Sequence, residues 1–194
     1  SLAGTDSFIL SVTPVNDAPV VHAIADQVID EDTSLTLALS ASDVDGDAVT
    51  FSASVDGNGS ASVDDSTLTI TPPQDYNGDI TVTVSASDGS LAGTDSFTLS
   101  VTPVNDAPVV HAIADQVIDE DGSLTLALSA SDVDGDAVTF SAYADNATAS
   151  VDGSTLTVSP DADFNGSLTV TVTADDGELE GFGSFTLAVN AVND

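Results

Sequence analysis

Hydrophobic and polar residues alternate with a period of two through most of this chain. Leucine occupies every second position of 35–39, and valine or isoleucine does so in 80–84. Successive side chains of a β-strand point to opposite faces, so this alternation is typical of strands with one buried face. Further alternating stretches cover 49–51, 68–70 and 97–101. We find no helical spacing of apolar residues, and the sequence therefore predicts an all-β protein.

The pattern is written twice, because the chain repeats itself. Residues 1–53 differ from residues 90–142 only in the pairs Ile9/Thr98 and Thr33/Gly122. Each copy offers about seven strands, if VVHAI and DQVID count as a split first strand, with Gly, Asp and Asn turns between them. This arrangement predicts two tandem Greek-key β-sandwiches.

The repeat also predicts how the chain is divided. Residues 1–14 match the last strand of a complete copy and are predicted to be the last strand of a preceding, truncated repeat. Residues 15–103 and 104–194 are predicted to be repeats 1 and 2. Since the chain starts within a repeat and contains no methionine, we expect it to be part of a longer polypeptide.

The charge of the chain is extreme and has one sign. It contains 33 acidic residues and no Lys or Arg, which gives a formal net charge of −33. With 41% hydrophobic residues the chain is nevertheless expected to fold. Nucleic-acid binding relies on basic side chains and is not expected, and neither is membrane insertion. Crowded carboxylates repel one another, so a bound cation is the expected compensation.

Three carboxylates fall within five residues of the repeated segment SASDVDGDAVTF. In the first copy they are Asp43, Asp45 and Asp47, and Gly46 permits a tight turn between them. Calcium binds six to eight oxygen atoms, and alternate residues of such a loop can turn their oxygens towards one point. A solvated acidic turn is the alternative, because Asp-Gly turns commonly join strands. The missing basic partners and the recurrence of the segment favour calcium. Other candidate ligands in the first copy are Glu31, Asp75, Asp88 and the linker residues Asn16 and Asp17.

The order of these motifs resembles that of a cadherin repeat. The segment SASDGSLAGTDSFTLSVTPVNDAP is similar to the end of such a repeat, where an Ala-x-Asp-x-Gly strand end leads into an Asp-x-Asn-Asp-Asn-Ala-Pro linker. VIDED is similar to the Pro-Glu-Asn region, and SASDVDGD to the Ala-x-Asp-x-Asp strand end. The resemblance covers both complete copies and is closest to bacterial cadherin-like tandem repeats of large secreted proteins and RTX-type adhesins. It implies cadherin- or immunoglobulin-like sandwiches and a secreted or cell-surface location.

The resemblance also implies calcium at the junctions between domains. The linker has Pro103 in place of the first Asp and lacks the second Asn, so one or two ions are expected instead of three. The junction inside the chain would use Glu31, Asp75, Asn105, Asp106, Asp132, Asp134 and Asp176, with Asp136 as an additional acid. The matching junction to a preceding domain would use Asn16, Asp17, Asp43, Asp45 and Asp88, with Asp47 as the equivalent additional acid. Half a site, expected to bind weakly, would remain at Glu120, Asp163, Asn193 and Asp194.

The aromatic residues separate into two groups. Those that recur at equivalent positions are predicted to lie in the core: Phe51 and Phe140, Phe97 and Phe185, Tyr76 and Phe164. Tyr143 replaces Ser54, Phe182 replaces Thr94, and strand parity directs Tyr143 away from the core. Exposed rings suit a sugar-binding face, and packing against a neighbouring domain is the alternative.

Two further kinds of chemistry find little support. His22 and His111, one per copy and without cysteine, make a poor zinc site and are interpreted as strand-face residues. No nucleophile motif such as Gly-x-Ser-x-Gly is present, so enzymatic activity is not expected.

The sequence therefore predicts a calcium-binding module that acts as a rigid extender or adhesion segment of a large bacterial secreted or cell-surface protein. Its expected partners are neighbouring repeats of the same chain. A carbohydrate-binding module with cell-surface glycans as ligands, or calcium-dependent homophilic adhesion, are the alternatives.

Overall fold

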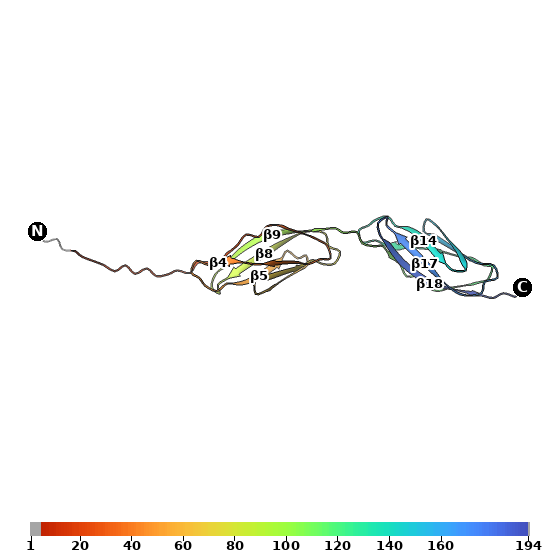
Figure 1. Ribbon diagram of the computed structural model, residues 1–194, viewed down its shortest axis with the longest axis horizontal. Coiled ribbons are helices and arrows are strands. Elements are labelled where there is room, and N and C mark those ends of the chain that lie inside the picture. Colours follow the sequence, from red (N-terminus) through yellow and green to blue (C-terminus); the bar gives the residue numbers. More distant parts are fainter. Residues whose placement is uncertain (1–4, 194) are drawn as a thin grey trace. The chain divides into compact units, whose positions relative to one another are not determined.

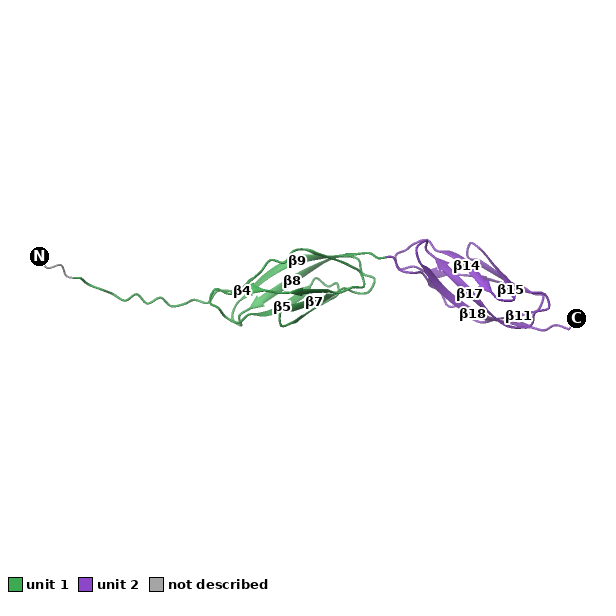
Figure 2. Cartoon of the chain, viewed as in Figure 1, with its two compact units in different colours: residues 1–104 green, residues 105–194 purple. Residues whose placement is uncertain are grey.

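The computed structural model describes residues 5–193 and divides the chain into two compact units, Ser1–Val104 and Asn105–Asp194 (Figure 2). That residues 15–103 and 104–194 are the limits of repeats 1 and 2 stays a prediction.

The alternating stretches of the first unit form nine strands, of which β5, β8 and β9 lie side by side (Figure 1). The strands of this unit are β1 (Val20–Val21), β2 (Gln27–Asp30), β3 (Leu35–Ala38), β4 (Ala41–Ser42), β5 (Thr50–Val55), β6 (Ser60–Asp64), β7 (Thr67–Thr71), β8 (Gly78–Ser87) and β9 (Ala92–Thr102).

The second unit repeats the same series of elements. Its strands are β10 (Val109–Val110), β11 (Gln116–Asp119), β12 (Leu124–Ala127), β13 (Ala130–Ser131), β14 (Thr139–Ala144), β15 (Ala147–Asp152), β16 (Thr155–Pro160), β17 (Gly166–Asp175) and β18 (Glu180–Asn190). The all-β prediction is confirmed, since every element in the described part of the chain is a strand.

Two sheets make up each sandwich. In the first unit their strand orders are β2-β9-β8-β5 and β3-β7-β6, and β1 pairs with β4. The first strand is split, as the sequence predicts: β1 pairs antiparallel with β4, whereas β2 pairs parallel with β9. Counting β1 with β2 and β3 with β4 as interrupted strands gives the predicted seven. The second unit has the same topology.

The core lies between the sheets and follows the alternation. In β8 the side chains of Ile80, Val82 and Val84 are fully buried, while the threonines between them face solvent. The recurring aromatic residues occupy the core or its margin, as predicted: Phe97 and Phe185 are buried, and Phe51, Tyr76, Phe140 and Phe164 pack against the core while half-buried.

Residues 5–14 form no strand, although they are nearly identical to part of β9. Phe8 and Ile9 are 88% and 96% exposed, whereas Phe97, the counterpart of Phe8, is 3% exposed. The difference has a physical cause: β9 pairs along its length with β8, and the described residues contain no such partner for 5–14. That residues 1–14 close a preceding repeat stays a prediction, and residues 1–4 lie outside the described part.

Candidate metal centre

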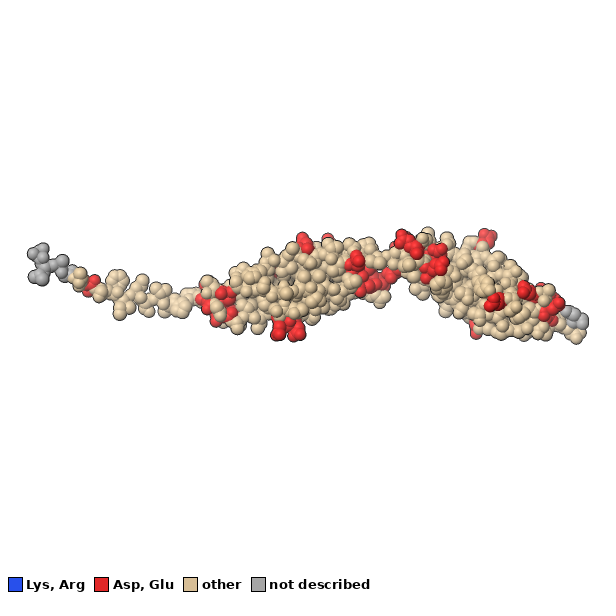
Figure 3. Space-filling model, in the orientation of Figure 1, with Lys and Arg blue, Asp and Glu red and all other residues tan. Residues whose placement is uncertain are grey.

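Acidic residues collect at both ends of each unit, and many of those on the visible face stand near these ends (Figure 3). In the first unit Asp75 precedes β8 and Asp88 follows it. A strand of 10 residues separates them, which corresponds to about 33 Å. We call the group at the end where the chain enters a unit the N-terminal cluster, and the group at the opposite end the C-terminal cluster. The N-terminal cluster of unit 2 consists of Asn105, Asp106, Asp132, Asp134, Asp136 and Asp176; its counterpart in unit 1 consists of Asn16, Asp17, Asp43, Asp45, Asp47 and Asp88. The C-terminal clusters consist of Glu31, Asp32 and Asp75 in unit 1, and Glu120, Asp121, Asp163 and Asn165 in unit 2.

One carboxylate oxygen organises the loop between β13 and β14. Oδ1 of Asp132 accepts hydrogen bonds from the backbone N–H groups of Asp134 at 3.0 Å and Asp136 at 3.2 Å. The equivalent Oδ1 of Asp43 accepts three such bonds in the first unit. The loop therefore curls around the first aspartate, and Gly135, with φ of +82°, supplies the left-handed turn.

The other oxygen of the same aspartate is buried without a hydrogen bond. In both units Oδ2, of Asp43 and of Asp132, is shielded from solvent and has no hydrogen-bond partner among the described residues. Leaving a buried carboxylate oxygen unpaired is costly, and the chain contains no Lys or Arg to compensate it. A bound cation would compensate the charge of this oxygen.

The three aspartates of the second loop converge on one point. Asp132, Asp134 and Asp136 each offer a carboxylate oxygen, and these atoms all lie within 4.8 Å of one another. Two oxygens that both bind a calcium ion at 2.3–2.6 Å can lie at most about 4.6–5.2 Å apart. The spacing therefore fits calcium, and Asp136, which the cadherin pattern does not require, belongs to the group.

The structure brings the linker residues onto the N-terminal cluster of the unit that follows them. Asn105 donates from Nδ2 to Oδ2 of Asp176 at 3.0 Å, and the N–H of Asp106 donates to Oδ2 of Asp134 at 2.8 Å. The same two contacts recur in the first unit, each at 2.8 Å, from Asn16 to Asp88 and from Asp17 to Asp45. Each predicted N-terminal set is therefore assembled within its own unit.

Hydrogen bonds lower the pKa of Asp176, which follows β17, and of Asp88, which follows β8. The N–H of Leu179 is the largest cause of the lowered pKa of Asp176, followed by the Asn105 amide and the N–H of Glu178. The pKa of Asp88 is lowered for the same reasons, by Leu91, Asn16 and Ser90. These donors favour the carboxylate form that a metal ligand needs.

The lowered pKa of Asp176 predicts a pH-dependent contribution to stability. The folded state favours the anion, so the contribution is full above the unfolded pKa of about 3.9 and is lost as pH falls through the lower folded value. The loss in unfolding free energy caused by Asp176→Asn, measured by urea unfolding in EDTA, should therefore shrink between about pH 6 and pH 2. Taking the difference between variant and wild type cancels the titration of the other acids. A pH-independent difference would contradict the prediction, and Asp88→Asn provides a second test.

A glutamate dominates each C-terminal cluster. Glu31 is 4% exposed, and its Oε1 accepts the N–H of Val104 at 2.7 Å. In the second unit Oε1 of Glu120 accepts the N–H of Val192 at 2.6 Å. Each glutamate thus fastens the chain that leaves its unit after the last strand.

Sequence reasoning missed three residues of the C-terminal clusters, Asp32, Asp121 and Asn165. Oδ1 of Asp32 accepts the N–H of Asp75 at 3.1 Å, and both residues have positive φ, 60° and 53°. In the second unit Asn165 donates to Oε2 of Glu120 and to the carbonyl of Asp163, both at 3.3 Å. The consecutive acids of VIDED and the Asn-Gly of DFNG were the available signals. Asp194 lies outside the described residues, and the combination of Glu31 and Asp75 with residues of the second unit stays a prediction.

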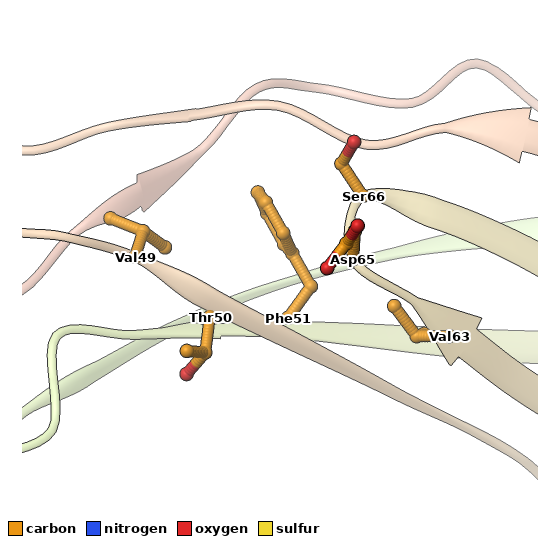
Figure 4. A pocket seen from close by; sticks show the side chains of 6 residues that line it. All are labelled: Val49, Thr50, Phe51, Val63, Asp65 and Ser66. Atoms are coloured by element: carbon orange, nitrogen blue, oxygen red, sulfur yellow. The ribbon is translucent and has the colours of Figure 1, made fainter.

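Other surface features carry less chemistry. A pocket of about 420 Å³ opens beside the ring of Phe51 and is lined by one acid, Asp65 (Figure 4). The equivalent pocket of the second unit has Gly153 in place of that acid, which indicates a gap at the sandwich edge and not a conserved pair of sites. His22 and His111 are exposed, and each hydrogen-bonds a serine hydroxyl through Nδ1 at 2.9 Å.

The topology of the two units defines the class of this protein. Both units are immunoglobulin-like sandwiches whose first strand changes sheet, and they are arranged in tandem along the chain. The chain belongs to the bacterial Ig domain family, whose model matches residues 16–102 and 105–189.

Comparisons with individual proteins agree with this assignment. Chitinase A of Pseudoalteromonas piscicida is 35% identical over 107 residues, which cover 52% of this chain and 13% of the chitinase. Human protocadherin-24 EC1-2 has a TM-score of 0.54 at 18% identity and covers 92% of this chain and 100% of its own. Drosophila N-cadherin EC1-4 has a TM-score of 0.53 at 18% identity, covering 92% and 50%. These structures share the fold and confirm the predicted resemblance to cadherin-like tandem repeats. No helix in the described part of the chain has the length and apolar character needed to span a bilayer.

Proposed function

We propose that this chain is a calcium-binding spacer, an extender or adhesion segment of a large bacterial secreted or cell-surface protein. Calcium would bind at the N-terminal clusters and fix each linker to the unit that follows it. The observation that carries the proposal is the buried, unpaired Oδ2 of Asp132, repeated at Asp43.

The donor set fits calcium better than other common ions. The N-terminal clusters consist of carboxylate and amide side chains, without histidine or cysteine. Hard oxygen donors suit calcium and magnesium, whereas zinc prefers nitrogen and sulfur. Calcium accepts six to eight oxygens in flexible arrangements, while magnesium demands a near-ideal octahedron. Three carboxylates on one curled loop, with further oxygens beside them, suit the more flexible ion.

Calcium would also remove a repulsion that the fold creates. The linker hydrogen bonds draw Asn105 and Asp106 to Asp176 and Asp134, so several anionic groups meet without a cationic side chain. An ion between them would neutralise this charge and fasten the linker. The proposal includes one or two ions at the junction inside the chain, with Glu31 and Asp75 as ligands from the first unit.

Calorimetric titration with calcium tests the proposal, with the same substitution at two equivalent positions. Asp132→Asn keeps the size of the side chain and removes its charge. It should abolish calcium binding at the N-terminal cluster of the second unit. Asp43→Asn is the matched control and should leave that binding intact, because Asp43 belongs to the cluster of the first unit, to which the described residues offer no counterparts of Glu31 and Asp75. No calcium binding beyond that of magnesium would overturn the proposal. Equal losses in the two variants would overturn the part of the proposal that uses Glu31 and Asp75 as ligands, because each cluster would then bind calcium without a preceding unit.

The comparison with chitinase A favours one alternative, in which the parent protein is a polysaccharide-degrading enzyme and these domains are its accessory parts. Homophilic adhesion is the other alternative, and sedimentation velocity with calcium and with EDTA distinguishes it, since only homophilic adhesion predicts calcium-dependent self-association.

A further inference from the structure

Two aromatic side chains stand on the outer face of the four-stranded sheet of the second unit. Tyr143 in β14 and Phe182 in β18 are each 65% exposed. The central strand β17 lies between them, with Thr171 opposite Tyr143 and Thr173 opposite Phe182. Since residues i and i+2 of a strand share a face, both rings project from the same side of the sheet.

The register surrounds the two rings with hydroxyl groups. One cross-strand row contains Tyr143, Thr171 and Ser184, and the next row contains Ser141, Thr173 and Phe182. The rings thus occupy opposite corners of a grid of six residues, with hydroxyl side chains at the other four. Two strand spacings and one two-residue step place their Cα atoms about 12 Å apart.

Neighbouring contacts hold the hydroxyl of Tyr143 and the backbone at Phe182 in place. The hydroxyl of Tyr143 donates a hydrogen bond to Oδ1 of Asp145. Phe182 lies between Gly181 and Gly183, and a Cβ on either glycine would overlap Pro108 or Val110. The backbone beneath Phe182 is therefore packed against the β10 segment. Such a face is formed before a ligand arrives, which reduces the entropic cost of binding.

The chemistry of this face points to a neutral sugar chain. Pyranose rings present an apolar C–H face, which packs on an aromatic ring, and hydroxyl groups, which hydrogen-bond with Ser and Thr. None of the six grid residues is charged, and the chain carries a net charge of −33, which repels anionic ligands. We propose that the outer face of β14, β17 and β18 binds a neutral polysaccharide.

The first unit provides an internal comparison. Its equivalent positions are Ser54 and Thr94, which face Thr83 and Ser85 of β8. The first unit forms the same sheets without these rings, so they are not required by the fold. The aromatic face also lacks the contiguous apolar centre that stable protein interfaces contain, which disfavours a second copy of the chain as the occupant.

Affinity electrophoresis and calorimetry on the full chain test the proposal, with cellohexaose, chitohexaose, laminarihexaose and mannohexaose as neutral probes. At least one probe should bind, and Tyr143→Ala and Phe182→Ala should each weaken that binding about tenfold or more. Both residues are exposed, so the variants should retain the unfolding free energy of the wild type. The double substitution Ser54→Tyr with Thr94→Phe should add a binding site to the first unit and raise the stoichiometry.

Four results would overturn the proposal. The first is that none of the four probes binds, and the second is that binding survives both alanine substitutions. The third is that polygalacturonate binds as tightly as a neutral probe. The fourth is that the substitutions mainly abolish self-association of the chain. Binding should persist in Asp132→Asn, so failure of the calcium proposal and failure of this one are distinguishable.

Discussion

Millimolar calcium is expected to raise the thermal unfolding midpoint of this chain by about 6–20 °C relative to EDTA. Extracellular calcium modules bind the ion with dissociation constants of about 10⁻⁴–10⁻³ M. Calcium at about 10 mM then stabilises the folded state by about 1.4–2.7 kcal/mol for each site. For a domain of this size each kcal/mol shifts the midpoint by about 4–8 °C. Circular dichroism during heating measures the effect.

Controls separate site binding from screening of the charge. Any salt lowers the repulsion among the 33 acidic residues, so all buffers need equal ionic strength. Magnesium should give a smaller shift, and Asp132→Asn should remove most of the calcium-specific part. Equal shifts with calcium and magnesium, unchanged in the variant, would mean that the cations only screen charge and that the loops are solvated turns.

Replacing Phe97 with alanine is expected to destabilise the first unit by about 3–5 kcal/mol, while the same change at Phe8 has almost no effect. Phe97 is 3% exposed in the core and Phe8 is 88% exposed. Truncating a buried phenylalanine removes apolar contacts and leaves a cavity, whereas an exposed one has little to lose. Urea unfolding followed by circular dichroism measures both changes.

The two phenylalanines make an unusually well-matched pair, because each ends a TDSF segment. Phe185→Ala should reproduce the large loss in the second unit, where that side chain is also 3% exposed. A loss above about 1 kcal/mol for Phe8→Ala would show that residues 5–14 pack in solution, against the prediction from their exposure.

Much of the fold could be predicted from the sequence because strand alternation is a local property. The apolar positions of 80–84 became the buried face of β8, and Tyr143 faces solvent as its parity requires. The split first strand was likewise predicted, from the successive segments VVHAI and DQVID. The repeat also identified Asp43 and Asp132 as equivalent candidate ligands.

The candidate site could be predicted only in part. The sequence named the acids of the N-terminal clusters, but not that Asp132 uses Oδ1 to organise its loop and leaves Oδ2 without a partner. It also missed Asp32, whose role depends on the N–H of Asp75, a residue 43 positions further along the chain. Such contacts depend on how distant segments are brought together, which no local motif specifies.

The sequence by itself determined which residues prefer strands, which face of each strand is apolar and where acids recur, because these properties depend on neighbours along the chain. Only the tertiary structure decided which strands pair and what each pairing buries. Gln27 of β2 pairs in parallel with Leu99 of β9, and Phe97 is buried where the nearly identical segment of Phe8 is exposed. The physical reason is that burial requires a partner strand, and the partner of β9 is supplied by the folded unit and not by the segment itself.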